Sequence, residues 1–197
     1  MSRFDLLDQM VESGNGYLLT TNVLNKGISK PTLAEYVKKR NMERVAHGVY
    51  RSENAWPDDL YRLALTNSRI VFSHETALSL HGLMEREPSE ISVTVSAGYN
   101  GTHLRKQGLR VYQVKTELYS LGITETKTYF GNPVRAYDME RSICDLLRSK
   151  NRTDVQVFRY ALQEYMSSDR KNLNRLMSYA KAFQIDSLVR TYTEVML

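Results

Sequence analysis

Cysteine is nearly absent from this 197-residue chain, which contains only Cys144. A single thiol has no partner for an internal disulfide, which suits a reducing compartment. Long apolar runs are lacking too: the densest, such as Ile70-Val71-Phe72, are three or four residues long, whereas a membrane span needs about 18 or more. The first five residues contain Asp5 and no apolar segment of a secretion signal. We therefore expect a cytoplasmic protein without a membrane partner.

The sequence also lacks the usual signatures of phosphate-binding loops and metal sites. The segment Gly98-Tyr99-Asn100-Gly101 has no following Gly, Lys and Ser or Thr, as a phosphate-cradling loop requires. His74 and His81 are seven residues apart, a rise of about 10 Å along a helix, so their rings cannot share one ion. Helix capping and packing account better for these two histidines.

Residues for catalysis are equally scarce. Glu125-Thr126-Lys127 resembles half of a metal-dependent nuclease site, but no aspartate lies between Asp59 and Asp138 to supply the other ligand. Cys144 has no obvious histidine partner and is expected to be a small packed side chain. A nuclease is therefore disfavoured, and we predict a protein that is not an enzyme, with no catalytic residues, no metal and no cofactor.

The composition is that of a folded globular protein with a mildly basic balance. Hydrophobic residues make up 42% and charged residues 25%, ordinary values for a chain that forms one or two domains. The net charge is +5 and the pI is near 9.2, which only weakly suggests a polyanionic partner. The first 51 residues carry 8 bases against 5 acids, and no acid lies between Glu90 and Glu117.

Residues 1–51 are predicted to form a winged helix-turn-helix domain. Phe4, Leu7 and Met10 recur at helical spacing before the Gly14-Asn15-Gly16 turn, and a short second helix ends at Gly27. Ser29 then caps a third helix with Pro31 in its first turn. After Arg40-Asn41 the spacing changes to period two, which predicts two strands joined through Ala46-His47-Gly48. Residues 52–57, which include Pro57, read as a linker.

Residues 58–197 are predicted to form a mixed α/β domain that ends in a helical bundle. Helices are expected near 58–67 and 73–82, and strands at 70–72, 91–95, 109–114, 123–130 and 133–136. Asp138 caps a further helix, and apolar periodicity predicts three more before the C-terminus. The whole chain is therefore expected to be of the α/β (α+β) class.

The third helix and the hairpin supply candidate DNA contacts. In a helix-turn-helix the second helix of the pair enters the major groove with its N-terminal side chains at the base edges. With Leu33 and Val37 facing inward, the residues predicted to contact DNA are Ser29, Lys30, Thr32, Tyr36 and Lys39, with Arg44 and His47 in the wing. The same pattern also suits a small protein-binding domain with incidental lysines.

A second basic patch is predicted outside the first domain, at Arg105, Lys106, Arg110, Lys115, Lys171 and Arg175. Because it includes the acid-free stretch, we expect its 105–115 part to supplement DNA affinity. Alternatives remain open: an acidic partner, lysines that protect a sheet edge, or charges that only confer solubility.

Several blocks of sequence together resemble AbiEi-type antitoxins, partners in bacterial abortive-infection toxin–antitoxin pairs. The blocks keep the order and spacing of that family across roughly residues 1–170. They are Gly16–Thr20, Gly27–Ser29, Glu43–Arg51, Phe72–Leu83, Ile91–Val95, Gly131–Val134 and Glu140–Leu147. One departure is the wing tip, often basic in the family, which here is His47.

The resemblance implies a non-catalytic protein with two functions. Its winged helix would repress its own operon at inverted repeats in the promoter, helped by the second domain. The second domain would neutralise a nucleotidyltransferase toxin encoded beside it, a type IV mode that acts without a stable toxin complex. The alternative is a plain winged-helix transcriptional regulator whose second domain binds a ligand or mediates assembly.

Overall fold

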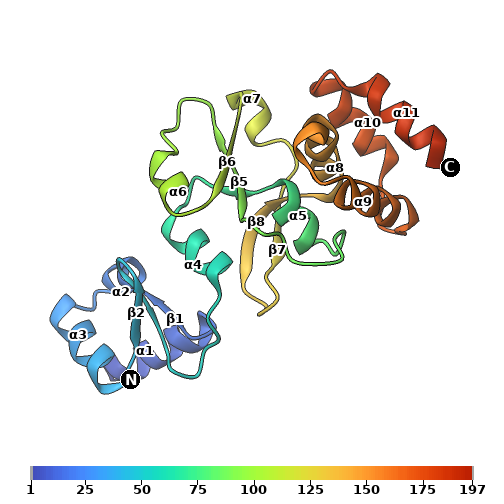
Figure 1. The fold of residues 1–197 in the computed structure, drawn as a ribbon. Helices are drawn as coiled ribbons and strands as arrows, with labels where there is room; N and C mark the ends of the chain where they lie inside the picture. The colour runs from blue at the N-terminus through green and yellow to red at the C-terminus, as the bar shows by residue number, and fades with distance from the viewer. Residues whose placement is uncertain (1, 197) are drawn as a thin grey trace. The chain divides into compact units, whose positions relative to one another are not determined.

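A computed structural model describes residues 2–196; Met1 and Leu197, the outer ends of the two predicted domains, lie outside the described residues. The chain forms two compact units of mixed α/β structure (Figure 1). The N-terminal unit runs to Ser68 and includes Phe130–Asn132, and the C-terminal unit contains Arg69–Tyr129 and the chain from Pro133 onward. No described helix is long and apolar enough to cross a membrane.

The N-terminal unit has a helical part and a small antiparallel sheet. Its elements are α1 (Arg3–Ser13), β1 (Tyr17–Leu19), α2 (Thr20–Asn25), α3 (Lys30–Lys39), β2 (Glu43–Ala46), β3 (Val49–Arg51) and α4 (Asp59–Thr66). The strand order is β1-β3-β2. The three helices before the hairpin were predicted, whereas β1 was not, because three residues are too few to reveal a period-two pattern.

Local chemistry explains where the first helices begin and end. A capping box joins Ser2 and Asp5 at the start of α1, where the Ser2 side chain accepts from the Asp5 N–H. Gly27 has a φ of +76°, the left-handed conformation that closes α2 as predicted. The α3 N-cap is Ser29, also as predicted.

The boundary between the units lies after Ser68, later than the linker predicted at 52–57. The Tyr17 hydroxyl donates to the Trp56 carbonyl at 3.1 Å and accepts from the Asp58 N–H at 3.0 Å. The Tyr61 ring packs edge-on against Tyr17, with 5.0 Å between centroids. These contacts attach α4 to the first unit, and no local sequence pattern reports them.

The C-terminal unit is built on a mixed sheet. Its elements are β4 (Val71–Phe72), α5 (His74–Leu80), β5 (Ser92–Ser96), α6 (Thr102–Lys106), β6 (Arg110–Val114), α7 (Thr116–Tyr119), β7 (Ile123–Lys127), β8 (Pro133–Tyr137), α8 (Met139–Arg148), the 3-10 turn η1 (Lys150–Arg152), α9 (Val155–Ser167), α10 (Leu173–Ala182) and α11 (Asp186–Met196). The short elements α6, α7 and η1 were not predicted.

The strand order in the C-terminal sheet is β6-β5-β4-β8-β7. The pairs β5–β6 and β4–β8 are parallel, and β4–β5 and β7–β8 are antiparallel. Helices α8 to α11, the last four α-helices of the chain, lie side by side (Figure 1). Their apolar cluster includes Leu78, Ile143, Leu162, Leu176 and Val189.

A buried arginine links α8 to the loop before β7. The Arg141 side chain is fully buried, and its Nε donates to the equally buried Asp145 at 3.0 Å. One terminal nitrogen donates to the carbonyls of Leu118 and Leu121, each at 2.8 Å. Gly122 must be glycine here, because its φ is +81° and a Cβ would lie 2.7 Å from the Cβ of Arg141.

Candidate nucleic-acid interface

The N-terminal end of α3 presents exposed polar groups on a fixed backbone. The Ser29 hydroxyl caps the helix by accepting from the Thr32 N–H at 3.4 Å, and it lies 2.9 Å from the Thr32 hydroxyl. Ser29 and Lys30 are exposed, whereas Thr32 is half-buried. Pro31 lies in the first turn, where its fixed φ suits a helix start. The helix end can therefore offer Ser29 and Lys30 to a partner.

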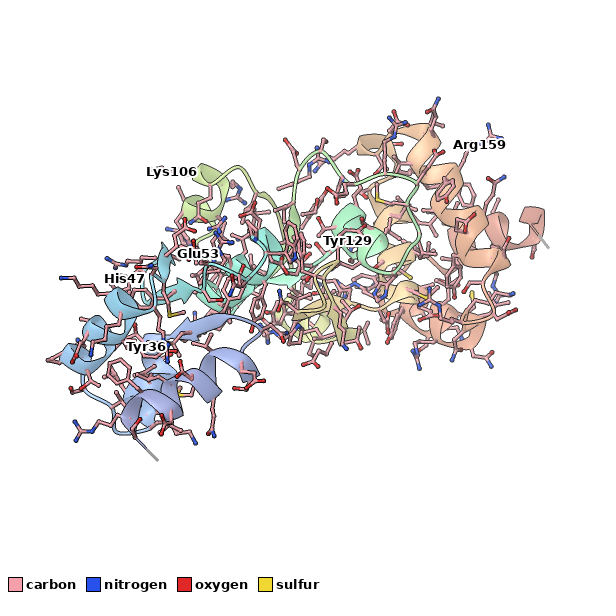
Figure 2. The ribbon with its side chains drawn as sticks, turned by 90° about the horizontal axis from the view of Figure 1, so that it is seen from below. Tyr36, His47, Glu53, Lys106, Tyr129 and Arg159 are labelled. Atoms are coloured by element: carbon pink, nitrogen blue, oxygen red, sulfur yellow. The ribbon has the colours of Figure 1, made fainter. Side chains whose placement is uncertain are left out.

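Tyr36 does not face outward, so its prediction as a DNA contact was wrong. Tyr36 (labelled in Figure 2) is 1% exposed, and its hydroxyl donates to the partly exposed Asp8 at 2.7 Å, at the edge of the core of the first unit. The position follows from helix geometry: Tyr36 is three residues after Leu33 and lies on the same inward face, next to Val37. Burial, reinforced by Asp8, raises the pKa of the Tyr36 hydroxyl.

The other end of α3 carries charges that already have partners. Lys39 forms an ion pair with Glu35 at 2.9 Å, and its ammonium lies 5.0 Å from the centre of the Phe4 ring. Arg40 forms an ion pair with Asp8. Lys38 is exposed and was missed by the sequence prediction. It stands nearly opposite Leu33 and Tyr36 around the helix, and that spacing could have identified it.

The turn between β2 and β3 exposes two basic side chains. A guanidinium nitrogen of Arg44 lies 3.1 Å from Nδ1 of His47, and both residues are exposed. Gly48, with a φ of +72°, permits the tight reversal. The predicted hairpin pair is therefore together at the turn, where Figure 2 labels His47.

The predicted second basic patch has less net positive charge in the structure than its sequence suggests, because acids from other segments approach it. Arg110 forms ion pairs with Glu90 at 2.8 Å and Glu75 at 3.8 Å, so acids distant in sequence neutralise it. Its part in a second basic patch stays a prediction, with its charge offset by these two acids. The remaining bases of this stretch are exposed: Arg105 and Lys106 on α6, of which Figure 2 labels Lys106, and Lys115 before α7.

Lys171 and Arg175 do not form the shared helix face that their spacing suggested. Lys171 precedes Asn172, the N-cap of α10, and its Nζ donates to the Ser168 carbonyl at 3.4 Å. Arg175 is on the helix, but it lies 3.7 Å from a carboxylate oxygen of Glu140 and 3.9 Å from one of Asp138. The helix begins at Leu173, two residues after Lys171, so Lys171 lies outside it.

Cys144 and His81 are packed side chains, whereas Glu125 and Lys127 are exposed on β7. Burial raises the pKa of the Cys144 thiol to about 12, so it is a poor nucleophile near neutral pH. His81 Nε2 lies 2.7 Å from the Tyr137 carbonyl. Among the described residues, no three His, Cys, Asp or Glu side chains gather as metal ligands would.

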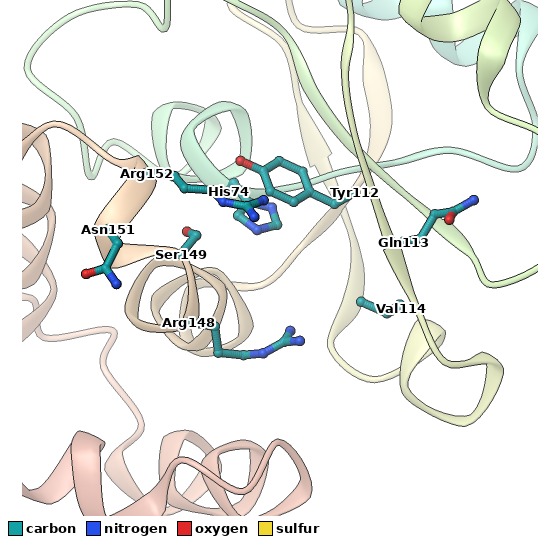
Figure 3. Close-up of a pocket in the computed structure, with 8 residues that line it drawn as sticks. All are labelled: His74, Tyr112, Gln113, Val114, Arg148, Ser149, Asn151 and Arg152. Atoms are coloured by element: carbon teal, nitrogen blue, oxygen red, sulfur yellow. The ribbon is translucent and has the colours of Figure 1, made fainter.

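A cavity of about 390 Å³ opens in the C-terminal unit, and the sequence analysis did not predict it. Its lining comes from α5, β6, the end of α8 and η1: His74, Tyr112, Gln113, Val114, Arg148, Ser149, Asn151 and Arg152 (Figure 3). None of these side chains is a carboxylate. A usable signal was the basic run Arg148 to Arg152 directly after a strongly amphipathic helix.

Comparisons with known proteins give a fold and no family. No family model matches the chain, and no curated protein matches it. The crystal structure of the RV2827C protein from Mycobacterium tuberculosis is similar, with a TM-score of 0.59 over 89% of this chain and 70% of that chain. The identity is 10%, so the likeness concerns the fold alone.

Proposed function

We propose that the N-terminal unit is a winged helix-turn-helix that binds double-stranded operator DNA. The observation that carries this proposal is the order α1-β1-α2-α3-β2-β3 with strands arranged β1-β3-β2. In that arrangement α3 is the helix that would enter the major groove, and the β2–β3 turn is the wing beside it.

The DNA contacts that we propose follow exposure as well as position. Ser29 and Lys30 at the start of α3 would reach base edges and phosphates, with Lys38 on the outward face of the same helix. Arg44 and His47 would contact the backbone from the wing. Lys39 and Thr32 take a smaller part, because one is ion-paired and the other is half-buried.

We further propose that the protein is a cytoplasmic antitoxin that represses its own operon and counteracts a nucleotidyltransferase toxin encoded beside it. The support is the resemblance of the seven sequence blocks to AbiEi-type antitoxins. A plain regulator with a ligand-binding second unit is the other candidate, and the cavity lined by Arg148 and Arg152 favours it.

The DNA proposal is tested with the full chain and DNA from upstream of its own gene. Fluorescence anisotropy should give a lower affinity for Lys30→Ala/Arg44→Ala, by about tenfold or more, because a base-edge contact is worth about 1–3 kcal/mol. The matched control, Arg159→Ala/Arg190→Ala, removes two exposed charges from α9 and α11. If both variants lost the same DNA affinity, the binding would be a non-specific electrostatic attraction, and the proposed contacts would be wrong.

The antitoxin proposal is tested separately by growth rescue. The full chain, co-expressed with the toxin from the adjacent gene, should restore colonies. The variant Lys30→Ala/Arg44→Ala should still rescue while it fails to repress a promoter reporter, because neutralisation is assigned to the second unit. Repression without rescue by the unsubstituted protein would favour the plain regulator.

A further inference from the structure

The arginine-lined cavity of the C-terminal unit has the composition of an anion site. The guanidinium of Arg152 makes no hydrogen bond or ion pair with any described residue; only the backbone N–H of Arg152 is engaged, donating to the Ser149 carbonyl at 2.8 Å. Arg148 uses one terminal nitrogen to donate to Asp145 at 3.1 Å and stacks over the Phe183 ring at 4.4 Å. Its other nitrogens bond to no described group, so both guanidinium groups keep donors for a ligand.

The charge balance around the cavity is positive. Asp145 is the acid beside Arg148, and the buried Arg141 already holds its other oxygen at 3.0 Å. One carboxylate is therefore shared by two arginines, and Arg152 adds a further positive charge. Ligands with negatively charged oxygen atoms would be attracted here. Phosphate groups fit arginine especially well, because their oxygens can accept two parallel hydrogen bonds from one guanidinium.

An aromatic pair forms one side of the cavity. The His74 and Tyr112 rings are stacked, with centroids 3.4 Å apart and planes inclined by 10° (Figure 3). Burial lowers the pKa of His74 to about 4, so its ring is neutral near pH 7. His74 also has a φ of +50°, an unusual backbone conformation for a histidine, and such outliers gather at binding sites.

The volume and the polar lining of the cavity indicate which anions it can hold. A volume of about 390 Å³ lies in the usual range of small-ligand sites, about 300–1,000 Å³, and exceeds what one phosphate ion fills. Asn151 adds an amide group that can donate to or accept from the rest of a ligand, whereas the amide nitrogen of Gln113 already donates to the Tyr99 carbonyl at 2.8 Å. A nucleic-acid backbone instead needs a basic track along an accessible surface.

We propose that this cavity binds a small organic phosphate, with Arg148 and Arg152 on the phosphate group. The remainder of the ligand lies beside Tyr112 and Asn151. This site extends the second candidate function, in which the C-terminal unit binds a ligand, and it does not depend on DNA binding by the first unit.

The test uses isothermal titration calorimetry on the full chain at constant ionic strength. The probes are AMP, ribose 5-phosphate, inorganic phosphate and adenosine. We expect at least one of the two organic phosphates to bind, inorganic phosphate to bind more weakly, and adenosine not to bind. Failure of both organic phosphates to bind, or equal affinity for inorganic phosphate, would overturn the proposal.

Variants locate the binding in the cavity. Arg152→Ala should weaken the organic phosphate about tenfold or more, since a hydrogen bond to a charged group is worth about 1.5–3 kcal/mol. Asn151→Asp, which adds a carboxylate, should also weaken binding. Arg159→Ala removes an exposed charge outside the cavity and should leave binding unchanged.

Two results would contradict this assignment. If Arg159→Ala weakened binding as much as Arg152→Ala, the attraction would be general and not local. If Arg152→Ala lowered DNA affinity while no organic phosphate bound, the arginines would serve nucleic acid. Because DNA affinity of the unsubstituted protein is measured independently, failure here leaves the DNA-binding proposal intact.

Discussion

The two units of this protein use charged residues in opposite ways. In the N-terminal unit the ion pairs Lys39–Glu35 and Arg40–Asp8 lie at the surface, around an apolar core. In the C-terminal unit Arg141 and Asp145 are fully buried, and Glu140 is buried beside Tyr165. Surface charge is available to an external polyanion, whereas buried charge must satisfy its partners inside the fold. The exposed bases of α3 and the β2–β3 turn therefore suit the proposed interface, whereas Arg141 belongs to a structural network inside the second unit.

The largest effect should follow removal of the buried carboxylate. Asp145→Ala leaves Arg141 buried without its ionic partner, and we expect unfolding free energy to fall by about 3–5 kcal/mol. Denaturant titration measures this. The control Asp59→Ala breaks an exposed pair with Arg62 and should cost less than about 1 kcal/mol. If the two variants lost similar unfolding free energy, the buried pair would be no more important for stability than the exposed pair, and the contrast between the units would be wrong.

The buried histidine should make the second unit sensitive to acid. Burial, which outweighs the attraction of Asp145, combines with smaller effects of Arg148, Arg141 and Arg110 to lower the folded-state pKa of His74 to about 4. The unfolded chain takes up a proton below about pH 6.5 while the folded protein does not. Stability should therefore fall as pH drops from about 6.5 to 4, by up to about 3 kcal/mol from this group.

The comparison of His74→Gln with the unsubstituted protein isolates that contribution. Urea titrations at pH 7 and pH 4.5 should show a smaller acid loss in the variant. His81, whose pKa burial also lowers, stays in both proteins and cancels in the difference. The same acid loss in both proteins would mean that His74 becomes protonated without cost in the folded state.

In the first unit, Tyr36 separates a structural role from a DNA-binding role. Tyr36→Phe removes the hydrogen bond to Asp8 and should cost about 1 kcal/mol of stability. Because the side chain is buried, DNA affinity should not change. If the variant lost DNA affinity while its stability stayed unchanged, Tyr36 would have a direct role in DNA binding.

The smallest effect is expected from the exposed bases of α6. Arg105→Ala/Lys106→Ala should lower DNA affinity slightly and reduce its salt dependence, by less than the same number of changes in α3 and the wing. Anisotropy over a series of salt concentrations detects this. If the salt dependence of DNA affinity did not change, these bases would not contact DNA, and they would serve solubility or toxin neutralisation instead.

Sequence reasoning recovered the longer elements and several caps, because helical periodicity and residues such as Ser29, Asp138 and Gly27 act locally. It missed β1, α6, α7 and η1, which are too short to establish a period. It also placed Tyr36 outside, although spacing from Leu33 puts it inward. Arg110 looked free because Glu75 and Glu90 approach it only after strand β6 joins β5.

The cavity shows a different limit. His74, Tyr112 and Arg152 come from three separate parts of the chain and meet only through the fold. Each is ordinary in its own sequence context. The boundary after Ser68 has the same origin, since Tyr17 reaches Asp58 across 41 positions.

The central claim, that surface charge on α3 and the wing binds DNA, is tested most directly by the salt dependence of affinity. The unsubstituted protein and the variants Lys30→Ala/Arg44→Ala and Arg159→Ala/Arg190→Ala are titrated with the upstream DNA from about 50 to 200 mM salt. We expect the first variant to lower the slope by about two, one for each lost phosphate contact, and the second to leave it unchanged. Identical slopes for all three proteins would contradict the claim.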